Sequence, residues 1–347
     1  MRPACHPTFP VTLNWANRRA PAAASTADLG IVQRGSRDNL LISGDNLKAL
    51  SALLDTVAGE VTLAYLDPPF FTGRVHERVE RSRDVRGGLV RSTRPAFDDR
   101  WAGLSEYLED ISDRIAAVRR LLAPHGSLVL HVDPKTSHYL KVVCDEVFGP
   151  DCFASEIVWR YRRWPAKTPN FQRVHDVLLR YVKDPQVPPR FNALYEPLAA
   201  TTLATWGTKK QRAVVGADGR RVRSSTTEDA SPGVPMGDVW DIGIVAPVAK
   251  ERTGYPTQKP AALLRRVIES LTDPGEIVLD PYLGSGTTVA VASELGRRSI
   301  GIDKNIEAIE IARTRLNALG VRPMHKRVLD DADEVAGETQ LPEVRSA

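Results

Sequence analysis

The segment Asp67-Pro68-Pro69-Phe70, directly after the apolar run 61–66, contains the residues best suited to chemistry in this sequence. A run of mostly β-branched, aliphatic and aromatic residues of this length is typical of a buried strand, and two successive prolines stop a helix or a sheet ladder. We therefore expect a stiff loop that presents a carboxylate, backbone carbonyls and an aromatic ring beyond the strand. Such a set fits a flat ring with an exocyclic amino group, as in a nucleobase; the alternative is a proline-stiffened loop with a solvated aspartate.

A second segment, residues 276–289, predicts a strand, a glycine-rich turn and the beginning of a helix, with glycines that let backbone N–H groups approach a ligand. A Walker loop is excluded because no lysine follows Gly286, and a dinucleotide fingerprint is excluded because Val289 occupies the place of its third glycine. Asp303 ends the next predicted strand about 20 residues later, a position from which a carboxylate accepts ribose hydroxyls. These features favour a nucleoside ligand without a pyrophosphate, and S-adenosylmethionine fits them.

With these motifs, the sequence resembles the β group of amino-directed DNA methyltransferases. Asp67-Pro68-Pro69-Phe70 is similar to their catalytic D-P-P-Y/F motif, and residues 280–287 are similar to their D-P-F-x-G-S-G-T cofactor motif. Residues 254–260 resemble their P-T-Q-K-P segment, and residues 42–50 resemble their G-D-N/C-L stretch. The similarity is greatest to the modification subunits of type III restriction systems and their smaller stand-alone relatives. The motifs occur in the family's order between residues 40 and 319.

The resemblance implies site-specific transfer of the methyl group of S-adenosylmethionine to the N6 amino group of adenine in double-stranded DNA. The target base has to leave the stack and enter the site. The Asp67 carboxylate and the Pro68 carbonyl are then expected to accept the two amino hydrogens, while Phe70 stacks on the base. These hydrogen bonds strengthen as positive charge develops on the nitrogen, which stabilises the transition state. The implied catalytic residues are Asp67, Pro68, Pro69 and Phe70.

The resemblance also implies a set of cofactor-binding residues. Two of them have alternative roles. Asp45 either accepts from the adenine amino group of the cofactor or caps the helix predicted over 47–54. Lys259 either contacts the methionine carboxylate or a phosphate, or merely precedes the next predicted helix. The expected set is Asp45, Asn46, Thr257, Gln258, Lys259, Asp280, Tyr282, Gly284, Ser285, Gly286, Thr287 and Asp303.

One residue departs from the family pattern D-P-P-Y/F-N-T-G, because Phe71 stands where the family has asparagine. The loss of this amide leaves two target bases open. Asp67 at the first position favours adenine N6, since cytosine-N4 enzymes usually have serine there, and cytosine N4 is the alternative. An RNA methyltransferase and a non-catalytic DNA-binding partner subunit are less favoured, and both motifs that decayed members lose are intact here. A nicotinamide oxidoreductase is excluded by the missing third glycine.

The motifs predict an α/β protein with a doubly wound, mostly parallel Rossmann-like methyltransferase sheet. Because the catalytic strand precedes the cofactor strand in the sequence, the fold is expected to be circularly permuted, with the catalytic half first. In the strand order 3-2-1-4-5, residues 277–280, 299–303, 40–42 and 61–66 are assigned to strands 1, 2, 3 and 4. This order places the glycine-rich turn and the Pro-Pro loop on opposite sides of one crevice. Helices are predicted over 104–122 and 137–148, and a further strand over 127–132.

The domain organisation expected from these assignments has five parts. Leu13 and Trp15 are expected to pack the N-terminal arm onto the domain. An Arg-rich stretch of mixed charge with Gly87-Gly88 predicts a mobile loop after the catalytic motif. The parts are an arm over 1–38, the catalytic half over 39–158 with a mobile loop over 74–100, a target-recognition insertion over 159–250 that also contains a sheet strand over 174–182, the S-adenosylmethionine-binding half over 251–320, and a C-terminal tail over 321–347.

The distribution of charge is more informative than the formal net charge of +4. Residues 156–223 contain 14 Lys and Arg against 5 Asp and Glu, so the rest of the chain is net negative. Aromatic residues alternate with the basic ones, and basic residues neutralise phosphates while aromatic rings fill the space of a displaced base. A solvated charged face is the alternative. The predicted DNA-contacting residues are Arg160, Arg162, Arg163, Trp164, Lys209, Lys210 and Arg212.

The composition of the 347-residue chain is ordinary for a globular protein, with 42% hydrophobic residues. No window approaches the about 18 apolar residues of a membrane span. Cys5, Cys144 and Cys152 have neither metal-ligand spacing nor a disulfide framework, so a reducing cytoplasm and no metal site are expected. His131 and His138 belong to no ligand cluster and are expected to be structural. No helicase or nuclease motif is present, and a homodimer and a separate restriction endonuclease stay open as partners.

Overall fold

The computed structural model describes residues 12–16, 18–21, 27–83, 89–165, 167 and 169–329, with backbone only at 79–83, 89–91, 211–213, 221 and 223–228. The chain divides into two compact units. One unit consists of residues 1–191 and 239–347, and the other of residues 192–238. The larger unit contains the main sheet and all of the residues expected to bind the cofactor or to act in catalysis.

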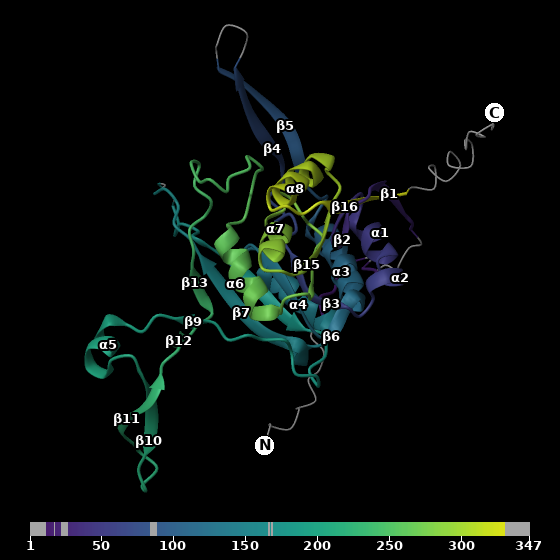
Figure 1. The fold of residues 1–347 in the computed structure, drawn as a ribbon. Helices are drawn as coiled ribbons and strands as arrows, with labels where there is room; N and C mark the ends of the chain where they lie inside the picture. Colours follow the sequence, from purple (N-terminus) through teal and green to yellow (C-terminus); the bar gives the residue numbers. More distant parts are fainter. Residues whose placement is uncertain are drawn as a thin grey trace, which may run out of the picture. The chain divides into compact units, whose positions relative to one another are not determined.

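The main sheet of the described residues has ten strands in the order β1-β16-β2-β15-β14-β3-β6-β8-β7-β13 (Figure 1). Neighbouring strands are parallel from β16 to β6, whereas β1 and β8 pair antiparallel with their neighbours. The edge pair β13–β7 is again parallel. The strands are β1 (Leu29–Gln33), β2 (Ser36–Ser43), β3 (Val61–Leu66), β6 (Leu122–Val132), β7 (Phe153–Arg160), β8 (His175–Val182), β13 (Val239–Asp241), β14 (Ile277–Asp280), β15 (Arg298–Asp303) and β16 (Pro323–Val328).

The strand order expected from the motifs is confirmed. Strands β2, β15, β14 and β3 are neighbours in this order and occupy the places 3, 2, 1 and 4 of the doubly wound sheet. The order of the chain reverses between β14 and β3, which is the switch point where such sheets bind ligands. Because these strands are parallel, the residues that follow them lie along one edge of the sheet.

Helices cover both faces of this sheet. Helix α1 packs on α3 and α3 on α4, while α6 packs on α7 and α7 on α8. Successive residues of a strand point to opposite faces, and accordingly Leu41 packs with residues of α7 and α8, whereas Ile42 packs with residues of α1 and α3. The helices of the larger unit are α1 (Asn46–Ala52), α2 (Leu54–Val57), α3 (Leu104–Leu121), α4 (Ser137–Phe148), α6 (Ala261–Leu271), α7 (Thr287–Glu294) and α8 (Ile306–Ala318), and a short 3-10 turn spans Pro150–Cys152.

The expectation of a loop over 74–100 is wrong for the described residues. Strands β4 (Arg74–Arg83) and β5 (Leu89–Asp99) form an antiparallel hairpin, and residues 84–88 lie outside the described part of the chain. Its base is held by Asp99, which accepts hydrogen bonds from the backbone and side chain of Thr72, and by stacking of His76 on Phe97 at 4.5 Å between ring centres. A Gly-Gly pair between two β-prone runs indicates a hairpin. The many charged residues in these runs instead favoured a loop.

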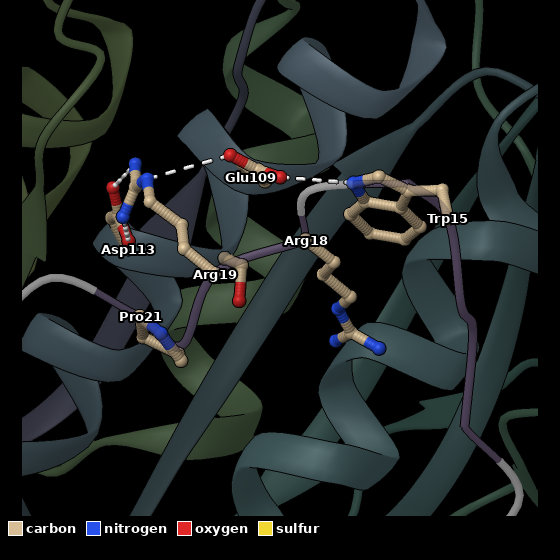
Figure 2. A pocket seen from close by; sticks show the side chains of 7 residues that line it. Trp15, Arg18, Arg19, Pro21, Glu109 and Asp113 are labelled. Carbon is tan, nitrogen blue, oxygen red and sulfur yellow. Dashed lines mark hydrogen bonds and ion pairs between the residues drawn. The ribbon is translucent and has the colours of Figure 1, made fainter.

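Residues 12–16 and 18–21 of the N-terminal arm lie against α3 and α4, and Figure 2 shows Trp15 and Arg19 beside Glu109 and Asp113 of α3. Leu13 and Trp15 pack against the main core, as the sequence predicts. The Trp15 indole donates to Glu109 Oε1 at 2.9 Å, and the Arg19 guanidinium binds both oxygens of Asp113 at 3.0 and 2.6 Å. The Arg18 guanidinium lies 4.6 Å from the centre of the Trp15 ring. The arm therefore binds the catalytic half through charges on α3 and through one half-buried indole.

Two expected boundaries differ from the structure. Residues 29–33 and 36–38, assigned to the arm, belong to strands β1 and β2, and residues 323–328, assigned to the tail, form β16 between them. These short runs of mixed polarity form strands at or near one edge of the sheet, and the alternation of hydrophobic residues does not reveal them. Residues 1–11 and 330–347 lie outside the described part of the chain.

The smaller unit contains a helix and two short antiparallel pairs. Its elements are β9 (Tyr195–Glu196), α5 (Ala200–Trp206), β10 (Lys209–Val215), β11 (Arg221–Ala230) and β12 (Val234–Pro235), with β9 paired to β12 and β10 to β11. Among the described residues of the whole chain, no helix has the length and apolar character needed to cross a membrane. The same described residues contain no group of three or more His, Cys, Asp or Glu that could hold a metal ion.

Candidate active site

The catalytic loop follows β3 at the switch point of the sheet. Asp67 is 17% exposed, and its two carboxylate oxygens have different surroundings. Oδ2 accepts a hydrogen bond from Nζ of Lys259. Oδ1 is buried and has no hydrogen-bond partner among the described residues, although Nδ1 of His131 lies 3.8 Å away. A buried acceptor without a donor is costly, so Oδ1 is an acceptor that a ligand can satisfy.

The loop also presents an aromatic ring and a strained residue. The Phe70 ring lies 5.6 Å from the His131 ring and 5.0 Å from the Lys259 ammonium. Phe71 has a φ angle of 55°, which is unusual for a bulky residue. Its ring stacks on Tyr107 of α3 with 5.4 Å between centres. The residue that replaces the family's asparagine therefore fixes the loop through hydrophobic stacking on α3.

The glycine-rich turn after β14 lies across the switch point from this loop. Gly286 has a φ angle of 71° and precedes α7, and a Cβ atom there would lie 2.5 Å from Cβ of Ala312 on α8. Gly284 has a φ angle of 49°, and its N–H donates to Oδ2 of Asp303 at 2.8 Å. The other Asp303 oxygen accepts from the Asn305 N–H at 2.8 Å. The two glycines thus permit a turn that is tied to the end of β15.

Burial shifts the pKa values of two carboxyls at this turn. It raises the pKa of Asp280 to about 7, although the Tyr282 N–H donates to this carboxylate at 3.0 Å. It raises the pKa of Asp303 to about 6. Burial disfavours the charged form of each carboxylate, and a nearby positive charge favours it. A cationic ligand is therefore expected to bind here and to restore the charged form of both groups. S-adenosylmethionine carries a sulfonium and an ammonium group together with ribose hydroxyl donors, so the donor and acceptor set fits it.

Asp45 is the N-cap of α1. Its Oδ1 accepts from the N–H groups of Leu47 and Lys48 at 2.9 and 3.1 Å, and Oδ2 lies 3.6 Å from the Arg114 guanidinium. Asn46 donates to the Pro281 carbonyl at 3.0 Å and accepts from Arg114 at 2.6 Å, so it ties α1 to the turn after β14. The capping alternative is therefore confirmed, and the Asp45 carboxylate, which is 39% exposed, stays accessible at the sheet edge.

The Thr257-Gln258-Lys259 segment is held by its own contacts. Thr257 has a φ angle of 57°. The Gln258 amide accepts from the backbone and hydroxyl of Thr253 at 2.8 and 2.9 Å and donates to the Glu251 carbonyl at 2.7 Å. Gln258 thus closes the loop that brings Lys259 to Asp67, and its amide is engaged there.

Three further residues of the expected cofactor set are mainly engaged with the protein. Ser285 and Thr287 are buried, and their hydroxyls lie 3.1 Å apart. Arg315 of α8 donates to the Ser285 carbonyl and to the Thr287 hydroxyl at 3.1 and 3.0 Å. Tyr282 packs against the main core, and burial raises the pKa of its hydroxyl above the ordinary value. These side chains shape the turn, in which only Tyr282 and Gly284 are half-buried and the other residues from 281 to 287 are buried.

The residues expected to contact DNA belong to both units. In the larger unit, Arg162, Arg163 and Trp164 are exposed directly after β7, and Trp164 is 91% exposed. Arg160 pairs with Asp241 of β13 at 2.9 Å. In the smaller unit, Lys209 and Lys210 are exposed on β10, and the side chain of Arg212 lies outside the described part.

Sequence reasoning did not place one residue next to the catalytic loop. His131, expected to be structural, is fully buried and lies directly behind Asp67 and Phe70. The sequence signal for this placement is that His131 lies near the carboxyl end of β6, which is two strands from the cofactor strand β14. The carboxyl ends of parallel strands share one edge of the sheet, where ligands bind.

Comparisons with known proteins agree with this geometry. A family model described as DNA methylase matches residues 61–314. The chain is 28% identical to the type II methyltransferase M.HpaI of Haemophilus parainfluenzae over 281 residues, which cover 81% of this chain and 75% of that protein. It is 29% identical to the DNA adenine methyltransferase YhdJ of Escherichia coli K12 over 284 residues, which cover 82% of this chain and 84% of that protein.

A solved structure shares the fold. It is that of a Thermus thermophilus protein assigned as a DNA modification methylase, in complex with S-adenosyl-L-methionine, and it covers 84% of this chain and 98% of its own with a TM-score of 0.50 and 17% identity. This likeness confirms the doubly wound α/β fold expected from the motifs.

Proposed function

The chain belongs to the DNA methylase family, and on this premise we propose that it transfers the methyl group of S-adenosylmethionine to the N6 amino group of adenine in double-stranded DNA. The observation that carries this proposal is the pair formed by Asp67 and Phe70. A buried carboxylate oxygen without a donor among the described residues and an aromatic ring both lie next to His131 and Lys259, across the switch point from the glycine-rich turn. This arrangement offers an acceptor and a stacking surface to a flat base with an amino group.

The chain's own residues account for the reactivity of the amino group. The N6 lone pair of adenine is delocalised into the ring, so the free amine is a poor nucleophile. Oδ1 of Asp67 and the carbonyl of Pro68 each accept one amino hydrogen, which favours a pyramidal nitrogen whose lone pair is free. Phe70 stacks on the extruded base. Both hydrogen bonds strengthen as charge develops on nitrogen, and this electrostatic stabilisation is realised in the transition state.

The cofactor supplies a methyl group activated by the sulfonium. Asp303 accepts ribose hydroxyls, Asp45 accepts from the adenine amino group of the cofactor, and Asp280 stabilises its positive charge. The turn around Gly284 and Gly286 brings backbone close to its methionine end. Lys259 donates to Asp67 in the free protein. When this ion pair opens, its ammonium binds the methionine carboxylate of the cofactor.

Adenine is the favoured target for two reasons. Asp67 stands at the motif position where cytosine-N4 enzymes usually have serine, and the relative YhdJ is named a DNA adenine methyltransferase. Cytosine N4 is the second candidate, because its amino group presents the same two hydrogens to Asp67 and Pro68. RNA methylation is less favoured because the matching family model is that of DNA methylases. A non-catalytic partner role is less favoured because the Asp67–Phe70 motif and the glycine turn are both intact.

The proposed partners follow from this activity. Arg160, Arg162, Arg163 and Trp164 contact the DNA from the larger unit, and Lys209, Lys210 and Arg212 contact it from the smaller one. Because DNA is the substrate, the proposed location is the cytoplasm. M.HpaI is a type II methyltransferase, so a separate restriction endonuclease and a homodimer are partners to test by pull-down and by light scattering.

The first test is methyl transfer from labelled S-adenosylmethionine to unmethylated bacterial DNA, followed by mass spectrometry of the nucleosides. N6-methyladenine that disappears with Asp67→Ala is the expected result. The matched control is Asp55→Ala, an exposed aspartate on α2, which retains activity. N4-methylcytosine would replace the adenine assignment, and absence of any methylated base despite cofactor binding would overturn the proposed function.

A further inference from the structure

His131 has polar and aromatic partners on every side. It is the second-last residue of β6, next to the catalytic loop, and is fully buried. Nδ1 lies 2.7 Å from the Tyr65 hydroxyl, and Nε2 lies 3.4 Å from Oδ2 of Asp176. The rings of Phe70 and Trp159 lie 5.6 and 5.4 Å from the imidazole ring. An apolar ring would fill this volume equally well, so the polar contacts call for a separate explanation.

The partners of His131 determine which nitrogen carries its proton. The Asp176 carboxylate can only accept a hydrogen bond, so Nε2 of His131 carries the imidazole proton and points to this carboxylate at 3.4 Å. Nδ1 is then the acceptor nitrogen for the Tyr65 hydroxyl, which stays protonated because burial raises its pKa well above the ordinary value. With Nδ1 occupied as an acceptor, His131 offers no donor to Oδ1 of Asp67 at 3.8 Å. This tautomer leaves Oδ1 free for an amino hydrogen while the ring holds the loop from behind.

The chain of contacts continues from Asp176 to the protein surface. Oδ1 of Asp176 accepts from the Tyr161 hydroxyl at 2.9 Å. Tyr161 is buried at the end of β7, and the guanidinium of Arg163 lies 5.1 Å from the centre of its ring and donates to its hydroxyl at 3.3 Å. Arg163 is exposed beside Arg162 and Trp164. One continuous series of side chains therefore joins the exposed basic segment to the back of the catalytic loop.

Burying a series of polar side chains costs free energy unless they are hydrogen-bonded. Each polar group must be paired, since a half-satisfied buried network is less stable than an apolar core. Strands β6, β7 and β8 are already joined by their backbone ladders, so the side-chain series is not needed to hold them together. What the ladders do not determine is the position of the Asp67 carboxylate, which lies beyond the end of β3.

We propose that His131 is a positioning residue for methyl transfer, which holds Asp67 and Phe70 in place and keeps Oδ1 of Asp67 free, and that Asp176 and Tyr161 fix its orientation and link it to the basic segment at Arg163. This inference rests on the proposed function and assigns it a further set of residues. An error of about 1 Å in the position of a catalytic group costs roughly 100-fold in rate, so the consequence is large enough to measure.

The experiment compares single-turnover methyl transfer by the full chain and its variants on unmethylated duplex DNA, with the protein and S-adenosylmethionine in excess over the DNA. His131→Phe keeps an aromatic ring at this position but removes both ring nitrogens. We expect the rate of methyl transfer to fall by roughly 10- to 100-fold. The dissociation constants for S-adenosylmethionine and for the duplex, each measured by equilibrium binding, should change by less than about threefold. His131→Gln, which can still donate to Asp176, should restore part of the rate.

Tyr161→Phe isolates the link, because it removes one hydroxyl and leaves the buried ring. We expect a rate loss of roughly 3- to 10-fold, about the loss of one hydrogen bond. In the double variant with His131→Phe, no further loss should occur, because residues that act through one another are not additive. The matched controls are His138→Phe and Tyr139→Phe on α4, both exposed, which keep the rate of the unchanged protein.

The outcomes separate the two proposals. Product from the unchanged protein together with full rates in His131→Phe and Tyr161→Phe overturns the positioning role and leaves the proposed function intact. Additive losses in the double variant overturn the link through Asp176. A rate loss that only follows a lower unfolding midpoint, with no difference between His131→Gln and His131→Phe, indicates a structural role and also overturns the inference. No product from the unchanged protein overturns the proposed function and, with it, this inference.

Discussion

Lys259 donates a hydrogen bond to the carboxylate of Asp67, a residue 192 positions away in the sequence, and its ammonium lies 5.0 Å from the centre of the Phe70 ring. Both contacts resemble those that the proposed function assigns to the target base, which donates to Asp67 and stacks on Phe70. Lys259 was expected near the cofactor or at the beginning of a helix. The structure places it at the catalytic loop, where it neutralises a carboxylate that is only 17% exposed.

The first prediction concerns this ion pair. Lys259→Met removes the ammonium but keeps an unbranched side chain, and it leaves the Asp67 carboxylate without its partner. Because both side chains are largely but not wholly buried, we expect the free energy of unfolding at pH 7 to fall by about 2 kcal/mol, less than for a fully buried pair. Urea unfolding measures this change. Asp67→Asn in the Lys259→Met background should recover part of the loss, whereas strictly additive effects of the two substitutions would contradict the coupling.

The second prediction concerns the pH dependence of cofactor binding. The pKa of Asp280 is about 7 and that of Asp303 about 6 in the free protein, and a cationic ligand favours their charged forms. The affinity for S-adenosylmethionine should therefore rise as the pH increases through these two values and become constant above them, with protons released on binding. Isothermal titration calorimetry in buffers of different ionisation enthalpy measures both effects. An affinity that is independent of pH would contradict a role for these carboxylates.

The stability of the free protein should have the opposite dependence. A carboxyl whose pKa is raised on folding binds its proton more tightly in the folded state, so its contribution is complete below the ordinary pKa of an aspartate, near 4, and is lost as the pH rises to about 7. Asp280→Asn removes this penalty, and the variant should be more stable than the unchanged protein at pH 8 but weaker in cofactor binding. Thermal unfolding at about pH 4 and about pH 8, on the two sides of this window, measures the difference; equal changes in stability for the two proteins would contradict the assignment.

The third prediction separates the two roles of Asp45. Asp45→Ala removes the N-cap of α1 and should lower the free energy of unfolding by about 1 kcal/mol, whereas Asp45→Asn keeps a capping oxygen and should cost only a few tenths. Asp45→Ala should bind S-adenosylmethionine less tightly because it has no acceptor for the adenine amino group, and Asp45→Asn should lose less because its neutral oxygen still accepts. An alanine variant with unchanged cofactor affinity would show that Asp45 acts only as a cap.

The fourth prediction concerns DNA binding by the segment after β7. Arg162→Ala should weaken binding to duplex DNA of any sequence and reduce the slope of log K against log salt concentration by about 1, the value for one phosphate contact. Trp164→Ala should weaken binding without changing this slope, since an aromatic ring displaces no counterion. Arg322→Ala is the matched control, because it is exposed beside β16 at the other edge of the sheet. A loss of the same size in the control would indicate a non-specific effect of net charge.

The sequence by itself determined the order of the central strands and the chemistry at their ends. Runs of apolar residues that end in Asp67 or Asp280, and glycines that permit a positive φ angle at 284 and 286, are local features whose meaning depends on a few neighbouring residues. Parallel pairing then brings those ends to one edge of the sheet. The cap at Asp45 is local for the same reason.

Only the tertiary structure decided which side chains meet at that edge. The pairing of Lys259 with Asp67 joins residues that belong to different halves of the sequence, and the contact of His131 with Asp176 joins two separate strands. Phe71 on Tyr107 and the hairpin of β4 and β5 are further examples, because packing and pairing across the chain overrode a local signal for a polar loop. The physical reason is that these contacts depend on strand register and side-chain direction, which arise when the sheet assembles and are not encoded in the spacing of residues along the chain.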